Sequence, residues 1–148
     1  AQCLDAYEKH GGNIIAVEEV PSEDTHMYGV VSVKQDFGAT FQIGGMVEKP
    51  PKGTAPSNLI ISGRYVLEPQ IFDILEKIEK GAGGEIQLTD GMKKLSESQD
   101  FFGVRFDGRT CDTGSKLGFL MANVAFALER PDIAPAFKAE LKKLIGSL

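Results

Sequence analysis

Cysteine and histidine are scarce in this sequence, and their scarcity excludes two classes of protein. Cys3 and Cys111 are the only cysteines among 148 residues, too few for the disulfide scaffold of a small secreted domain. We therefore expect a reducing compartment, the cytoplasm. His10 and His26 have no cysteine or histidine neighbours at the spacing of a metal site, so we expect both on the surface or in loops.

Long apolar runs and an excess of positive charge are also missing. No apolar run approaches the roughly 20 residues that span a bilayer, and the first residues lack the pattern of a signal peptide. The formal net charge is -5, from 21 acidic and 16 basic residues spread along the chain. The sequence therefore predicts no membrane segment and no nucleic-acid partner, and its charges are expected on a solvated surface.

What is present is a mixture of strand and helix patterns, of a length that suits one domain. Apolar or alternating runs predict strands at 14–20, 29–34, 40–49, 58–67 and 101–107. Helical periodicity predicts helices at 2–10, from Pro69 to the glycines at 81–84, at 87–95, at 116–129 and within 133–148. Helices that cover strands indicate an α/β fold, and the hairpin-like stretch 29–49, with a bend at Gly44-Gly45, makes the sheet mixed.

No linker divides the chain, so residues 1–148 are expected to form a single portion that ends in the helix 133–148. The chain starts without Met, on a predicted helix and before any strand, which favours an excerpt from a longer protein. The inner stripe of the helix 116–129 is predicted to be Leu117, Leu120, Met121, Val124 and Leu128. The apolar face of the last helix either packs on the chain's own core or forms a subunit contact.

Four segments lie where a strand ends or a helix begins, the usual place for sites in open α/β sheets: 28–30, 47–50, 84–90 and 111–115. In the segment 47–50, the adjacent residues Glu48 and Lys49 are expected to point to opposite sides of a strand and not to form a simple pair. The carboxylate can accept sugar hydroxyls while the ammonium meets a phosphate. Two exposed charges before a proline turn are the alternative.

The other segments also allow a structural and a functional interpretation. Gly29 lets a ligand approach the backbone closely, or it simply begins a strand. Asp112 or Ser115 can cap the helix that follows, whereas the functional interpretation makes Asp112 an oxygen ligand for Mg²⁺ beside substrate phosphates. The glycine loop before residue 85 either approaches a ligand or ends a helix.

The order of these segments is more specific than any one of them. Tyr-Gly-Val at 28–30, Val-Glu-Lys-Pro at 47–50, Ala-Pro-Ser-Asn-Leu at 55–59, Gly-Arg-Tyr-Val-Leu at 63–67, Gly-Glu-Ile-Gln-Leu-Thr-Asp at 84–90 and Asp-Thr-Gly-Ser-Lys-Leu-Gly-Phe at 112–119 follow one another. Over essentially the whole chain, this order resembles bacterial UTP–glucose-1-phosphate uridylyltransferases. Related glucose-1-phosphate thymidylyltransferases share the Glu-Lys-Pro and Asp-Thr-Gly elements, but Gln-Leu-Thr-Asp with Ser-Lys-Leu-Gly favours the uridylyl group.

The resemblance implies a mixed-sheet, Rossmann-like nucleotide-diphospho-sugar transferase fold, of which this chain is the C-terminal, sugar-binding portion. It implies the conversion of UTP and glucose 1-phosphate to UDP-glucose and pyrophosphate with Mg²⁺, in an enzyme that is a homo-oligomer at full length. By this resemblance Gly29 contacts the glucose ring through its backbone and Glu48 binds sugar hydroxyls. Lys49, the catalytic candidate, holds the sugar phosphate, and Asp112 lies near the metal.

The nucleotide-binding motifs of that family are missing from the sequence. Its Gly-rich loop with Thr-Arg and its Pro-Lys-Met-Leu-Pro run have no match in residues 1–148, so the chain alone is expected not to turn over UTP. A non-catalytic sugar-phosphate-binding or regulatory module of the same fold is the alternative. A third interpretation takes Asp112-Thr113-Gly114 as the motif of an aspartic protease, which would require an all-β fold that dimerises.

Overall fold

A computed structural model describes residues 1–79 and 84–147 of the chain, in two compact units, Ala1–Asp107 and Gly108–Leu148. We had expected a single portion over 1–148. The chain passes from the first unit to the second within the segment 106–115, which has neither helix nor strand. This segment contains no proline and only two glycines, Gly108 and Gly114, and it is short, which is why the sequence showed no boundary. Each unit is described separately below.

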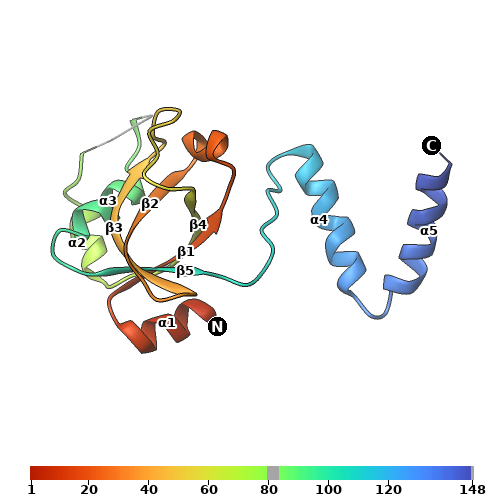
Figure 1. The fold of residues 1–148 in the computed structure, drawn as a ribbon, viewed down its shortest axis with the longest axis horizontal. Helices are drawn as coiled ribbons and strands as arrows, with labels where there is room; N and C mark the ends of the chain where they lie inside the picture. The colour runs from red at the N-terminus through yellow and green to blue at the C-terminus, as the bar shows by residue number, and fades with distance from the viewer. Residues whose placement is uncertain (80–83, 148) are drawn as a thin grey trace. The chain divides into compact units, whose positions relative to one another are not determined.

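The first unit is built on a mixed sheet of five described strands: β1 (Asn13–Glu19), β2 (Gly29–Asp36), β3 (Thr40–Glu48), β4 (Leu59–Val66) and β5 (Phe101–Arg105). Their order is β1-β4-β2-β3-β5, and β5 returns to β1, so that the sheet closes into a small barrel (Figure 1). The β1–β5 pair is parallel and the others are antiparallel. The mixed sheet is thus confirmed, but it is closed and not open, because β5 pairs with both β1 and β3.

The β2–β3 hairpin is irregular at the glycines where a bend was predicted. Ser32 lies opposite Gly45 and Val33 lies opposite Ile43, so Gly44 has no partner across the ladder. A bulge of this kind bends a strand and increases its twist. The predicted bend at Gly44-Gly45 is therefore confirmed, and it helps a short hairpin curve around a closed sheet.

Helices cover the sheet of the first unit on two sides (Figure 1). The larger core cluster joins strand side chains such as Phe41 to Ile71 of α2 (Gln70–Leu75) and to Met92 and Leu95 of α3 (Leu88–Leu95). A second cluster sets α1 (Gln2–His10) against β1 and β5, through Ala6, Ile14 and Val104. A 3-10 helix, η1 (Ser22–Met27), connects β1 to β2.

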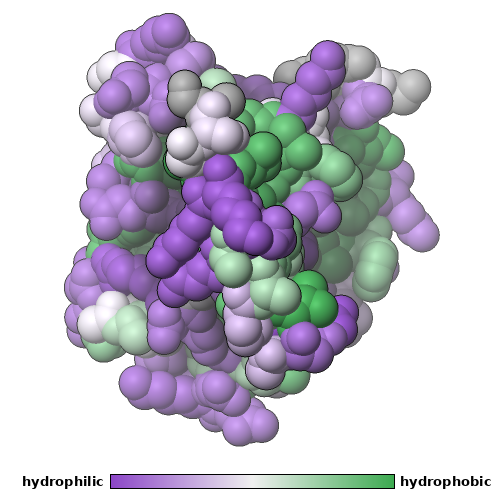
Figure 2. Space-filling model, turned by 90° about the vertical axis from the view of Figure 1, so that its right-hand side faces the viewer, coloured by the Kyte–Doolittle hydropathy of each residue, from purple (hydrophilic) through white to green (hydrophobic). Residues whose placement is uncertain are grey.

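The second unit is a pair of helices, α4 (Lys116–Glu129) and α5 (Ala134–Gly146). The predicted inner stripe of α4 is not covered within this unit, since Leu117 is 71% and Leu120 is 61% exposed and Ala122 is the buried residue of α4. The expectation of an inner stripe fails because apolar residues occur around much of α4, whereas one neighbouring helix covers one side. Figure 2 shows hydrophobic side chains at the surface among hydrophilic ones.

The two histidines have different surroundings. His10, expected on the surface or in a loop, is instead partly buried between the rings of Phe37 and Phe102, with centroids 5.4 and 4.6 Å away. Its Nε2 lies 3.0 Å from Thr40 Oγ1. Long-range packing of α1 on the sheet decides this position, which no local pattern reveals. His26 lies in η1 and is partly exposed, and its Nδ1 is 2.7 Å from the carbonyl oxygen of Glu23.

Candidate functional site

Gly29 and Glu48 lie side by side at one end of the closed sheet. β2 begins at Gly29, β3 ends at Glu48, and the antiparallel ladder pairs these two residues directly. A Cβ atom added to Gly29 would lie 3.0 Å from Glu48 Oε2 and 3.1 Å from Ile61 Cδ1. The Glu48 carboxylate therefore occupies the space beside the glycine backbone. Two residues predicted from separate segments are thus brought together.

Lys49 follows β3 with an unusual backbone. Its φ is 43°, and it is the one non-glycine residue of the described chain with a positive φ. This left-handed region costs about 1–2 kcal/mol for a residue with a Cβ, so it persists only where its surroundings hold it. Here the Lys49 N–H donates to the carbonyl oxygen of Tyr28 at 3.0 Å, one bond beyond the strand pairing.

The left-handed turn places the two charges of this segment close together. Lys49 Nζ lies 3.8 Å from Glu48 Oε1. Our expectation that the two side chains point to opposite sides and form no pair is therefore wrong. The alternation of side chains holds only along an extended strand, and the backbone leaves that conformation at Lys49.

The Glu48–Lys49 pair is asymmetric in its exposure. The side chain of Glu48 is 21% exposed and that of Lys49 is 65% exposed. A pair this accessible is screened by water and contributes little to stability. The ammonium therefore remains available to an incoming anion, while the carboxylate is held in place by its neighbours.

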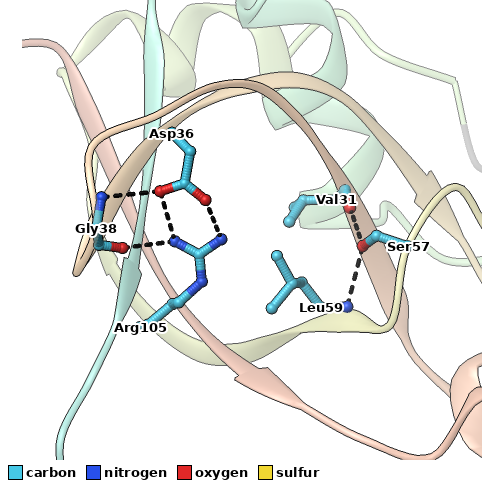
Figure 3. A network of polar contacts seen from close by, with 6 residues as sticks. All are labelled: Val31, Asp36, Gly38, Ser57, Leu59 and Arg105. Atoms are coloured by element: carbon cyan, nitrogen blue, oxygen red, sulfur yellow. Dashed lines mark hydrogen bonds and ion pairs between the residues drawn. The ribbon is translucent and has the colours of Figure 1, made fainter.

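Strand β4 brings residues near Glu48 to which the sequence assigned no role at the site. The Ile61 side chain borders the space beside Gly29. Burial and, to a lesser extent, the negative charge of Glu48 raise the pKa of Tyr65. Ser57, just before β4, donates to the carbonyl oxygen of Val31 at 2.5 Å and accepts the N–H of Leu59 at 3.0 Å (Figure 3). No local pattern could have linked β4 to Glu48, because the contact arises from strand order.

Asp112 belongs to the second unit, where its contacts are those of a turn. Its Oδ1 accepts the N–H of Gly114 at 3.0 Å. Ser115 caps α4, since its Oγ accepts the N–H of Gly118 at 3.0 Å. The capping interpretation is therefore confirmed for Ser115. The role of Asp112 as a metal ligand stays a prediction.

The donor set can be tested for its fit to Mg²⁺. Residues 1–79 and 84–147 contain no group of three or more His, Cys, Asp or Glu side chains that could hold a metal ion. Asp112 is exposed and offers one carboxylate, with one oxygen already in the turn. Mg²⁺ commonly binds through one or two carboxylates together with substrate phosphates. Asp112 fits as a single protein ligand of that kind.

The remaining predicted segment, 84–90, leads into α3. Gly84 has a φ of 74°, and Thr89 and Asp90 lie in the first turn of the helix. The preceding Gly81 and Gly83 lie outside the described residues, so the predicted glycine loop is described only at its end. A cavity of about 520 Å³ lies close by, lined by residues of 73–79 and 90–97 and by none of Gly29, Glu48, Lys49 and Asp112.

Two exclusions made from composition can be compared with the structure. Cys3 and Cys111 are both free thiols, each of intermediate exposure. Among the helices of the described residues, none is long and apolar enough to cross a membrane.

Comparison with known proteins relates this arrangement to one family. A family model described as nucleotidyl transferase matches residues 1–129. The UTP–glucose-1-phosphate uridylyltransferase of Staphylococcus epidermidis is 46% identical over 143 residues, covering 97% of this chain and 50% of the relative. That of Bacillus subtilis is 47% identical over 146 residues, covering 96% and 50%. The chain thus spans about half the length of these curated relatives.

A solved structure shows the same fold. The structure described as a UTP-bound UGPase from Acinetobacter baumannii superposes with a TM-score of 0.84 at 38% sequence identity. The superposition covers 97% of this chain and 49% of that one. The expected mixed α/β fold is thereby confirmed as the fold of these proteins, over about half of their length.

Proposed function

This chain belongs to the nucleotidyl transferase family, and on that premise we propose that it forms the sugar-phosphate-binding half of a UTP–glucose-1-phosphate uridylyltransferase. The observation that carries the proposal is the Glu48–Lys49 pair beside Gly29. One end of the sheet presents an anion and a cation 3.8 Å apart. A sugar phosphate offers hydroxyl donors and a phosphate, which match these two charges.

In the reaction proposed for the whole enzyme, an oxygen of the glucose 1-phosphate phosphate attacks the α-phosphorus of UTP. The bond from that phosphorus to the bridging oxygen of pyrophosphate breaks, which gives UDP-glucose and pyrophosphate. Such a transfer depends on positioning and on neutralised charge more than on a covalent partner. Lys49 would bind the sugar phosphate and reduce its repulsion from the triphosphate, while Glu48 would orient the ring by accepting hydrogen bonds from its hydroxyls.

Mg²⁺ is part of this proposal. When bound, it would supply charge neutralisation to the phosphates. Asp112 would be its ligand from this chain, with the remaining ligands from phosphates, water and the rest of the enzyme. A cytoplasmic location and a homo-oligomeric full-length enzyme are proposed with it.

The chain is proposed to be inactive by itself, because the family's nucleotide-binding motifs have no match in its sequence. We had also expected this half to be the C-terminal one. The comparisons do not support that placement, so the proposal rests on the contents of the half and not on its position. An enzyme half without the triphosphate site can bind a sugar phosphate but cannot bring it to UTP.

Calorimetric titration of the chain with glucose 1-phosphate tests the proposal. We expect binding that Lys49→Ala weakens about tenfold, the effect of removing one charge-assisted contact. Lys9→Ala, which removes an exposed lysine of α1, is the matched control and should leave the affinity unchanged. Equal affinities in all three proteins would refute the proposed phosphate site.

A synthesis assay separates the enzyme half from a non-catalytic module of the same fold. UTP, glucose 1-phosphate and Mg²⁺ are supplied to the chain alone and to the chain coexpressed with the missing half of a relative. UDP-glucose formed only in the second sample is the expected result. Binding of glucose 1-phosphate without activity in either sample would favour the module, and activity of the chain alone would contradict the proposed inactivity.

A further inference from the structure

Gly29 occupies a position whose backbone does not require glycine. The described glycines with left-handed φ values are Gly11, Gly12, Gly38, Gly53, Gly63 and Gly84, and Gly29 is not among them. It begins a regular antiparallel strand. An alanine could adopt this backbone, and strands generally favour a side chain over none. The reason for a glycine must therefore lie in the space around it.

That space is filled by two side chains. The position of a Cβ on Gly29 is 3.0 Å from Glu48 Oε2 and 3.1 Å from Ile61 Cδ1, with Ile61 Cγ1 at 3.6 Å. The first two separations are shorter than ordinary van der Waals contacts, so a side chain would have to displace the carboxylate or the isoleucine. Ile61 packs against the core cluster, which leaves it little freedom to move. The carboxylate is the more movable neighbour.

The opposite side of the carboxylate is also occupied. Oε1 faces the Lys49 ammonium at 3.8 Å, and the Lys49 backbone is held by its hydrogen bond to Tyr28. Oε2 lies over the bare backbone of Gly29. The carboxylate thus lies between the Lys49 ammonium on one side and the Gly29 backbone on the other.

We propose that Gly29 is a positioning residue, whose missing side chain provides the space in which the Glu48 carboxylate is oriented toward a sugar. This inference rests on the function proposed above and adds a role for Gly29 that differs from a direct backbone contact with the ligand. It implies that Gly29 controls recognition of the sugar hydroxyls and leaves recognition of the phosphate unaffected. The direction of a carboxylate decides which hydroxyls it reaches, so the same residue would affect discrimination between epimers.

The first test needs no ligand. Thermal unfolding is measured for the wild-type chain, Gly29→Ala, Glu48→Ala and the double variant. Gly29→Ala is expected to lower the Tm, and the Tm decrease should largely vanish in the Glu48→Ala background, because the crowded carboxylate is gone. An equal Tm decrease in both backgrounds would overturn the proposal. If Gly29→Ala does not fold, the double variant is expected to recover the fold, and its failure to do so would count against the proposal.

Gly45→Ala is the matched control for this cycle. Gly45 lies on β3 of the same hairpin and has no left-handed φ, and a Cβ there would meet Ser32 Oγ at an ordinary 3.5 Å. We expect Gly45→Ala to leave the affinity for glucose 1-phosphate unchanged. A loss equal to that of Gly29→Ala would show that any side chain on this hairpin disturbs binding, which contradicts a specific role for Gly29.

Affinity then tests the role in recognition. Gly29→Ala should lower the affinity for glucose 1-phosphate about tenfold, the effect expected from misplacing a carboxylate that hydrogen-bonds hydroxyls. Its affinity for inorganic phosphate should not change, and its preference for glucose 1-phosphate over galactose 1-phosphate should narrow. In a Glu48→Gln background the additional loss should be small. Equal losses for the sugar phosphate and for inorganic phosphate would overturn the proposal.

The isoleucine provides a separate check. Ile61→Val removes the Cδ1 atom that crowds Gly29 but leaves the carboxylate in place. The affinity loss caused by Gly29→Ala should persist in the Ile61→Val background. Full recovery of the affinity would mean that contact with Ile61, and not with Glu48, causes the loss. If the wild-type chain binds neither sugar phosphate nor phosphate, the proposed function is wrong. The Tm values of the Gly29→Ala and Glu48→Ala variants still decide whether a side chain at position 29 displaces the Glu48 carboxylate.

Discussion

The two units of this chain bury their apolar residues to very different extents. In the first, the closed sheet and its helices enclose two clusters that include fully buried residues such as Ile14, Ile15 and Phe41. In the second, α4 buries Ala122 and α5 buries none of its described residues. The first unit therefore derives its order from long-range contacts, and the second from helix formation and capping within the unit.

Separating the units should have the largest effect. We expect residues 1–107 to unfold cooperatively as an isolated polypeptide, because their core is complete within the unit. We expect residues 108–148 to be weakly helical alone, since helices of this length are marginal in water without a packed face. Far-UV circular dichroism of both polypeptides during heating checks this contrast. A cooperative transition in 108–148 would show that the two helices suffice for a stable unit.

Removing one phenylalanine from each unit sharpens the comparison. The Phe41 ring is fully buried, lies against Gly103 and faces the guanidinium of Arg105, whose Cζ is 4.6 Å from the ring centroid. Phe41→Ala should lower the free energy of unfolding by about 3–5 kcal/mol. Phe119 of α4 is 54% exposed. Phe119→Ala should change the free energy of unfolding by about 0.5 kcal/mol or less. Denaturant titration of both variants measures the difference.

A capping variant tests how far the second unit depends on local interactions. Ser115 Oγ accepts the Gly118 N–H at 3.0 Å at the start of α4. Ser115→Ala should destabilise this helix by about 1 kcal/mol, seen as faster amide hydrogen exchange in 116–120 with no change in β1 to β5. Ser98→Ala, after the end of α3, is the control. Unchanged exchange in 116–120 would mean that the cap is unimportant.

The smallest effect is expected from an exposed ion pair of the first unit. The Gly38 N–H and then the Arg105 guanidinium lower the pKa of Asp36, in the arrangement drawn in Figure 3. Because the folded-state pKa lies below the unfolded value, this contribution to stability is present above about pH 4 and is lost as the pH falls through the folded-state pKa. Asp36→Asn should flatten the decrease of Tm in that acidic range. An unchanged slope would show that the pair does not contribute.

Local patterns predicted most elements with small differences at their ends, but the helix predicted from Pro69 to the glycines at 81–84 is shorter, since α2 ends at Leu75. The helix at 2–10 and the helix at 116–129 have the predicted bounds, and the predicted terminal helix within 133–148 runs from Ala134 to Gly146. The strand from Gly29 extends to Asp36, two residues beyond the prediction of 34. These agreements arise because glycine, proline and apolar periodicity act within a few residues of each other.

The candidate site was predicted in its residue types but not in its geometry. Glu48 and Lys49 were chosen from one tripeptide, yet their pairing depends on a left-handed backbone at Lys49, which the sequence did not indicate. The contribution of Ile61 was not predicted, because it comes from a strand brought beside β2 by the fold. The roles assigned to Gly29, Glu48, Lys49 and Asp112 stay predictions until binding is measured.

The sequence by itself determined the order of helices and strands, the mixed character of the sheet and the family to which the chain belongs. Each of these depends on residues close together in the chain or on motifs in a fixed order. Only the tertiary structure decided that the sheet closes through β5 and that Glu48 fills the space beside Gly29. The physical reason is that side-chain contacts of a few ångströms between distant residues follow from packing, which local propensities do not specify.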